Sequence, residues 1–72
     1  MTEIPKMDRA DMLRVRLQLL RDEHSDLDQA IGAMEERPAP DMLAVRRLKK
    51  KKLQIKEEIV RIEDEIHPDI IA

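Results

Sequence analysis

Few residues of this chain have side chains able to carry out chemistry. The histidines are His24 and His67, Ser25 and Thr2 carry the hydroxyls, and the sequence has no cysteine and no tyrosine. His24 cannot activate Ser25 on a helix, because adjacent helical residues do not face one another. No HxxxH pair or cysteine pair offers the ligands of a zinc site. We therefore expect no catalytic residue, metal, cofactor or small-molecule substrate, and predict that the chain is not an enzyme.

A run of basic residues allows two interpretations. As a functional site, it is a patch that attracts nucleic-acid phosphates in a sequence-independent, salt-sensitive way. As a structural feature, it is a solvated helix surface, because consecutive residues spread around a helix. The chain is also net acidic at -2 and has no aromatic side chain on which bases could stack. Nucleic-acid binding is the alternative hypothesis, with a patch made of Arg46, Arg47, Lys49, Lys50, Lys51 and Lys56.

Prolines at positions 5, 38, 40 and 68 divide the chain into segments that favour helix. These segments are rich in residues that lose little side-chain entropy in a helix, such as Leu, Met, Ala, Glu, Lys and Arg. Asp8 suits an N-cap, and Pro38 disfavours helical geometry in the residue before it. The sequence predicts one unit, 1–72, with a helix at 8–36, a turn at 37–40, a helix at 41–66 and an unassigned tail at 67–72.

Apolar residues recur at alternating steps of three and four in both segments, which is the heptad pattern of a coiled coil. The first seam is Leu13, Leu17, Leu20, His24, Leu27, Ile31 and Met34. The second seam is Val45, Leu48, Lys52, Ile55, Ile59, Ile62 and Ile66. His24 and Lys52 are the polar interruptions. Such residues commonly fix the alignment of helices; alternatively, His24 responds to pH or contacts a partner, because histidine titrates near neutrality.

The order of charges indicates how the two helices pair. Each segment begins with basic residues and ends with acidic ones. An antiparallel pairing sets the basic half of each helix against the acidic half of the other, and the short connection requires the same arrangement. Exposed ion pairs select an orientation more than they stabilise it. The predicted fold class is all-α, an antiparallel two-helix coiled-coil hairpin.

Large apolar residues also lie outside the seams. A two-helix hairpin has only one shared seam, and chains this small usually need more burial. We interpret these residues as an interaction surface, covered by self-association into a helical bundle or by a helix of another protein. Membrane-surface binding is disfavoured because Trp and Phe anchors are absent. The predicted surface is Met12, Val15, Leu19, Leu53 and Val60, with Ile70 and Ile71 of the tail.

Two stretches carry a family resemblance. They are residues 20–28 (LRDEHSDLD) and 47–59 (RLKKKKLQIKEEI), joined through Arg37-Pro38-Ala39-Pro40. This pattern resembles the YdcH-like family of small bacterial proteins, a family of unknown function, over residues 20–62. The resemblance implies a helical hairpin in a bacterial cytoplasm. It implies no enzyme activity and brings no catalytic or binding residue.

Hydropathy and charge also bear on location. No stretch approaches the roughly 20 apolar residues of a membrane span, and no charged-then-apolar leader opens the chain. We therefore expect a cytoplasmic protein. The leading hypothesis is a non-enzymatic protein–protein interaction module, or a small regulatory or adaptor coiled coil, that forms a homo-oligomer and binds a partner helix.

Overall fold

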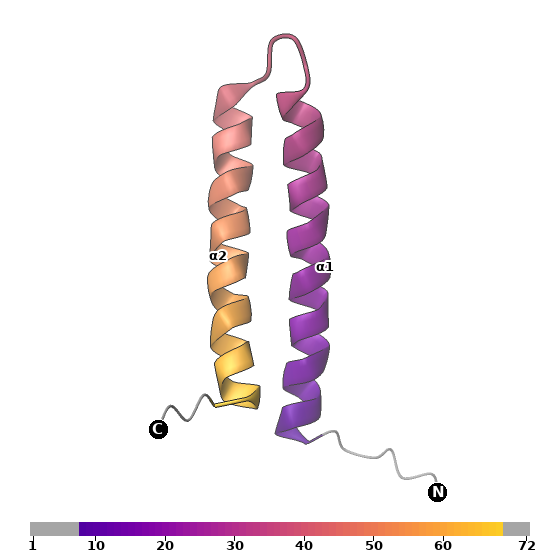
Figure 1. Ribbon diagram of the computed structural model, residues 1–72, viewed down its shortest axis with the longest axis vertical. Helices are drawn as coiled ribbons and strands as arrows, with labels where there is room; N and C mark the ends of the chain where they lie inside the picture. Colours follow the sequence, from indigo (N-terminus) through magenta and orange to yellow (C-terminus); the bar gives the residue numbers. More distant parts are fainter. Residues whose placement is uncertain (1–7, 69–72) are drawn as a thin grey trace, which may run out of the picture.

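The protein is an antiparallel helical hairpin, seen in a computed structural model that describes residues 8–68. Helix α1 spans Arg9–Glu35 and helix α2 spans Met42–Ile66. The start of α1 and the end of α2 lie together at one end of the hairpin, the open end, opposite the turn (Figure 1). No strand occurs within the described range. The predicted fold class is therefore confirmed. Ile70 and Ile71, with most of the predicted tail, lie outside the described residues.

Aspartate side chains begin both helices. The Asp8 carboxylate accepts a hydrogen bond from the Asp11 backbone N–H at 2.8 Å, and the Asp41 carboxylate accepts one from Ala44 at 3.2 Å. Each bond satisfies a donor that has no partner inside the helix. The predicted helix ranges, 8–36 and 41–66, differ from the observed ones only by including these N-caps and the C-cap Glu36.

The hydrophobic core is a single aliphatic seam between α1 and α2. All of the buried apolar side chains are predicted seam residues, and Leu13, Leu27 and Ile66 pack against them while partly exposed. Burial of these faces, rather than helix propensity, supplies most of the stability of helices this long. The buried residues are Leu17, Leu20, Ile31, Val45, Ile55, Ile59 and Ile62.

Ion pairs border the seam on both flanks and show its register. On one flank, each step of seven residues along α1 is matched by a step of seven back along α2, since Arg9 pairs with Glu65 and Arg16 with Glu58. The other flank follows the same rule with the pairs Arg21–Glu63 (2.8 Å) and Glu35–Lys49 (3.0 Å). Midway between these flanks, the register sets His24 opposite Ile55.

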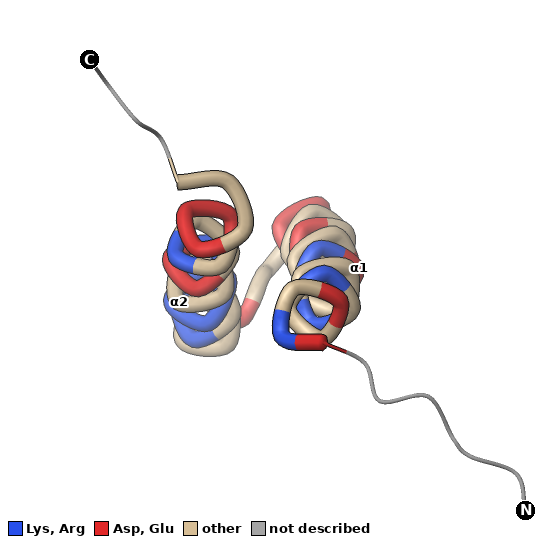
Figure 2. The backbone as a smooth tube through the Cα atoms, turned by 90° about the horizontal axis from the view of Figure 1, so that it is seen from below, with Lys and Arg blue, Asp and Glu red and all other residues tan. Residues whose placement is uncertain are grey.

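The predicted charge order is present in the folded hairpin. Figure 2, seen from the open end, shows α2 mainly acidic near the viewer and basic further away. On α1, a first turn that mixes acidic and basic residues is followed by basic residues and then, further away, by acidic ones. Because the paired side chains are largely exposed, each pair contributes at most about 1 kcal/mol. The pairs therefore select the antiparallel orientation, and the aliphatic seam stabilises it.

Candidate functional site

An open hollow on the outer side of α1 collects three of the predicted surface residues. Met12, Val15 and Leu19 are each at least half exposed, and Leu19 reaches 60%. They share this hollow with Arg9, Leu13 and Arg16, whereas α2 contributes none of its lining. The heptad spacing explains their position, because residues between seam positions turn away from the partner helix. The three residues thus form a row of large apolar side chains that faces water.

The exposed apolar residues of α2 lie elsewhere. Leu53 borders a second hollow that it shares with His24 and with three lysines of α2, on the flank that carries the Glu35–Lys49 pair. Val60 is also exposed, seven residues further along the same face of α2. The structure thus gathers Met12, Val15 and Leu19 into one surface but keeps Leu53 and Val60 apart from it.

Sequence reasoning missed two exposed apolar residues near the turn. Met42 and Leu43 are each more than half exposed at the start of α2. The signal was the one that identified Leu53, a large apolar residue outside the heptad seam. Lys50 and Arg46 separate Leu43 from Leu53 on the outer side of α2.

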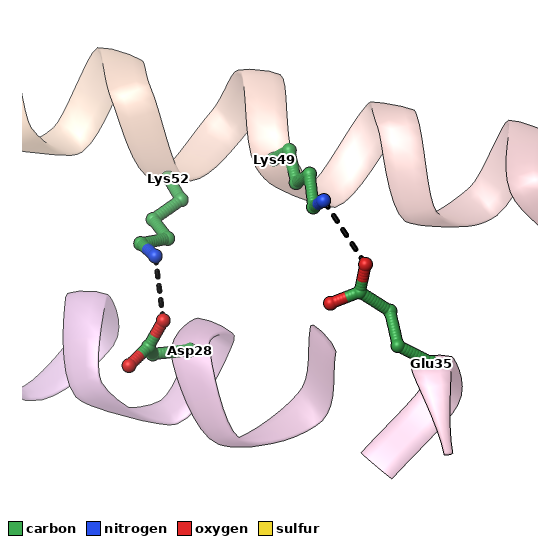
Figure 3. Close-up of polar contacts among 4 residues, drawn as sticks. All are labelled: Asp28, Glu35, Lys49 and Lys52. Carbon is green, nitrogen blue, oxygen red and sulfur yellow. Dashed lines mark hydrogen bonds and ion pairs between the residues drawn. The ribbon is translucent and has the colours of Figure 1, made fainter. Parts of the chain in front are cut away.

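The two polar seam residues, His24 and Lys52, line the same hollow of the hairpin. His24 is half-buried. Lys52 has a side chain that is 33% exposed, and its Nζ donates a hydrogen bond to Asp28 Oδ1 at 2.5 Å (Figure 3). The stem of Lys52 thus lies along the seam while its ammonium reaches the acidic half of α1.

The Lys52 ammonium lowers the pKa of the Asp28 carboxyl, mainly through their hydrogen bond and then through its charge, with a smaller effect from His24. A lowered pKa in the folded chain means that the pair stabilises the hairpin above the ordinary aspartate pKa. That contribution is lost as the pH falls through the folded-state pKa of Asp28. Because the Asp28 side chain is largely exposed, the contribution is modest.

The predicted basic patch divides into paired and free cations. Lys49 is already bound to Glu35 at 3.0 Å, close to the Lys52–Asp28 pair (Figure 3). Within residues 8–68, the other members form no ion pair with a carboxylate. Helical spacing places Arg46, Arg47 and Lys50 together on the outer side of α2, whereas Lys51 and Lys56 belong to opposite flanks.

Comparison with protein families identifies the relatives of this hairpin. Residues 17–63, which include most of both helices, match the family described as "Protein of unknown function (DUF465)". The chain belongs to the DUF465 family. No curated protein and no solved structure matches it. Membership of DUF465 is consistent with the resemblance to YdcH-like proteins.

Only part of the candidate surface of this DUF465 chain lies within the residues that match the family. Leu19 and the exposed apolar residues of α2 lie within residues 17–63, whereas Met12 and Val15 precede that range. Across the described part of the DUF465 hairpin, no cluster of His, Cys, Asp or Glu side chains could hold a metal ion. Neither described helix combines the length and apolar character needed to cross a membrane.

Proposed function

We propose that this DUF465 protein is a non-enzymatic protein–protein interaction module, which self-associates and binds a helix of a protein partner. The observation that carries the proposal is the exposed row formed by Met12, Val15 and Leu19 on α1. Their spacing of three and four residues matches the way in which an amphipathic helix presents anchors to a groove or to another helix.

The energetics support the use of this row as an interface. Covering a large aliphatic side chain stabilises a complex by about 1.5–3 kcal/mol before the costs of association are subtracted. The hairpin by itself has one seam, and cores in chains of this size rarely supply more than about 3–5 kcal/mol. Burial of the exposed row therefore adds stability that the isolated hairpin lacks.

A double substitution in the row tests the proposal. We expect Val15→Glu with Leu19→Glu to abolish self-association without lowering helicity, since both side chains face away from α2. Sedimentation velocity over a concentration series measures association, and circular dichroism measures the fold. Ala33→Glu is the control, because Ala33 is exposed on α1 and lies outside the row. A native chain that is folded and strictly monomeric at every concentration would contradict self-association.

The free cations favour nucleic-acid binding as a second candidate function. Arg46, Arg47 and Lys50 are exposed together and form no ion pair within the described hairpin, so they are available to phosphates. Titration with duplex and single-stranded oligonucleotides at low and physiological salt tests this candidate. Phosphate contacts are strongest at low salt, so an absence of binding there would exclude it.

A further inference from the structure

The outer sides of the two helices carry stripes of opposite charge. The α1 outer stripe is apolar toward the open end and acidic toward the middle of the helix, with the residues Met12, Val15, Leu19, Asp22, Asp26 and Gln29. The α2 outer stripe is largely apolar toward the open end, basic toward the turn and apolar again at Leu43, with the residues Val60, Glu57, Leu53, Lys50, Arg46 and Leu43. Every residue of both stripes is exposed in the hairpin.

The spacing of the two stripes matches residue by residue. Read from the open end toward the turn, α1 advances from Met12 by steps of three, four, three, four and three. From Val60, α2 runs back by the same steps. Because alternating steps of three and four form a seam on each helix, the two stripes can pack as antiparallel partners in a single register.

In that register, two layers set apolar against apolar side chains and two set an acid against a base. Met12 meets Val60 and Leu19 meets Leu53, so the apolar ends coincide. Further along, Asp22 meets Lys50 and Asp26 meets Arg46. The remaining layers, Val15 with Glu57 and Gln29 with Leu43, set an apolar side chain against a polar one and add no attraction.

We propose that the α1 outer stripe binds the α2 outer stripe of a second copy of this chain, so that hairpins associate side by side with their open ends level. This inference rests on the proposed function and names its partner. The charge complementarity of the stripes selects the second copy. The four charged residues, Asp22, Asp26, Arg46 and Lys50, take part in no ion pair within residues 8–68.

The directions of the stripes determine the form of the assembly. The α1 stripe leans toward the flank of the Arg16–Glu58 pair, since Leu19 shares a hollow with Arg16. The α2 stripe leans toward the opposite flank, since Leu53 shares a hollow with Lys49. The two stripes of one hairpin therefore point to opposite sides, and each binds a different neighbour. Because the contact joins two unlike surfaces, it adds hairpins one after another in an open assembly instead of closing into a two-copy bundle.

Charge reversal tests this arrangement. One variant carries Asp22→Lys with Asp26→Lys, and the other carries Arg46→Glu with Lys50→Glu. Sedimentation velocity is measured over a concentration series, and circular dichroism checks that each variant is folded. For the native chain, we expect the mean sedimentation coefficient to rise steadily with concentration and to fall with added salt. Each variant alone should associate at least about tenfold more weakly, because two attractive layers become repulsive.

Recombining the changes should restore association. An equimolar mixture of the two variants pairs a basic α1 stripe with an acidic α2 stripe and leaves the other contact native. A single chain with all four substitutions keeps the net charge of the native protein, so its recovery cannot arise from overall charge. Recovery in both experiments would confirm the register.

Three outcomes would contradict this open assembly of hairpins. If the Arg46→Glu, Lys50→Glu variant associates as the native chain does, the contact joins α1 to α1. If all the charge variants associate as the native chain does while Val15→Glu with Leu19→Glu does not, the stripe pairing is wrong but the proposed function stands. If the native chain forms only a closed dimer, the open assembly through unlike stripes is wrong.

Discussion

Replacement of Ile59 by aspartate is expected to unfold the hairpin. Ile59 is only 5% exposed and belongs to the core cluster with Leu17 and Leu20 of α1. The change removes a buried aliphatic side chain and places a carboxylate in the seam without a partner, a combination that costs about 3–5 kcal/mol or more. A core of this size supplies about the same stability. Far-ultraviolet circular dichroism should therefore show loss of most helical signal at 25 °C.

The adjacent residue provides the control for this prediction. Val60 is 45% exposed on the outer side of α2, so Val60→Asp should change stability by no more than about 0.5 kcal/mol. Its effect is measured at low concentration, where any contact between copies is negligible. If Ile59→Asp and Val60→Asp melt alike, the helices do not pack through the seam described above.

Replacement of both His24 and Lys52 by leucine is expected to give the largest gain in stability. His24 and Lys52 interrupt otherwise aliphatic seams and are partly buried. Leucine at each position would add apolar contacts across the seam, with a gain of about 1 kcal/mol per site after allowance for partial burial. Loss of the Lys52–Asp28 pair costs little because the Asp28 side chain is 62% exposed. The melting temperature should rise by about 10 °C.

Lys51→Leu is the matched control for this double substitution, since Lys51 adjoins Lys52 but is exposed. Thermal melts should show almost no change for the control. A second effect concerns specificity, because polar seam residues fix register at some cost in stability. The stabilised variant should therefore populate additional oligomers, visible by sedimentation. A melting temperature at or below that of the native chain would mean that His24 and Lys52 are not seam residues that limit stability.

The local features of the hairpin follow from the sequence because their causes are local. The prolines end helical segments through the geometry of their own ring and of the preceding residue. Asp8 and Asp41 act as caps through bonds to backbone groups three residues away. The heptad spacing predicted every buried residue, because a side chain's direction on a helix depends only on its position in the turn.

The placement of the surface residues required the tertiary structure. The sequence shows that Leu19 and Leu53 lie outside their seams, but not that they belong to opposite flanks of the hairpin. It also does not show that Lys52 binds Asp28, or that Lys49 is already bound to Glu35. Met42 and Leu43, at the start of α2, are exposed apolar residues that the predicted surface did not include.

The sequence alone thus determined the two helices and their antiparallel orientation, through proline positions, heptad spacing and charge order. The tertiary structure alone decided which acid faces which base and which apolar side chains share a surface. The physical reason is that these properties depend on the register and on the side of contact between two helices. The register and the side of contact are set only when the two seams pack together, because the sequence of one helix does not specify which residues of the other lie beside it.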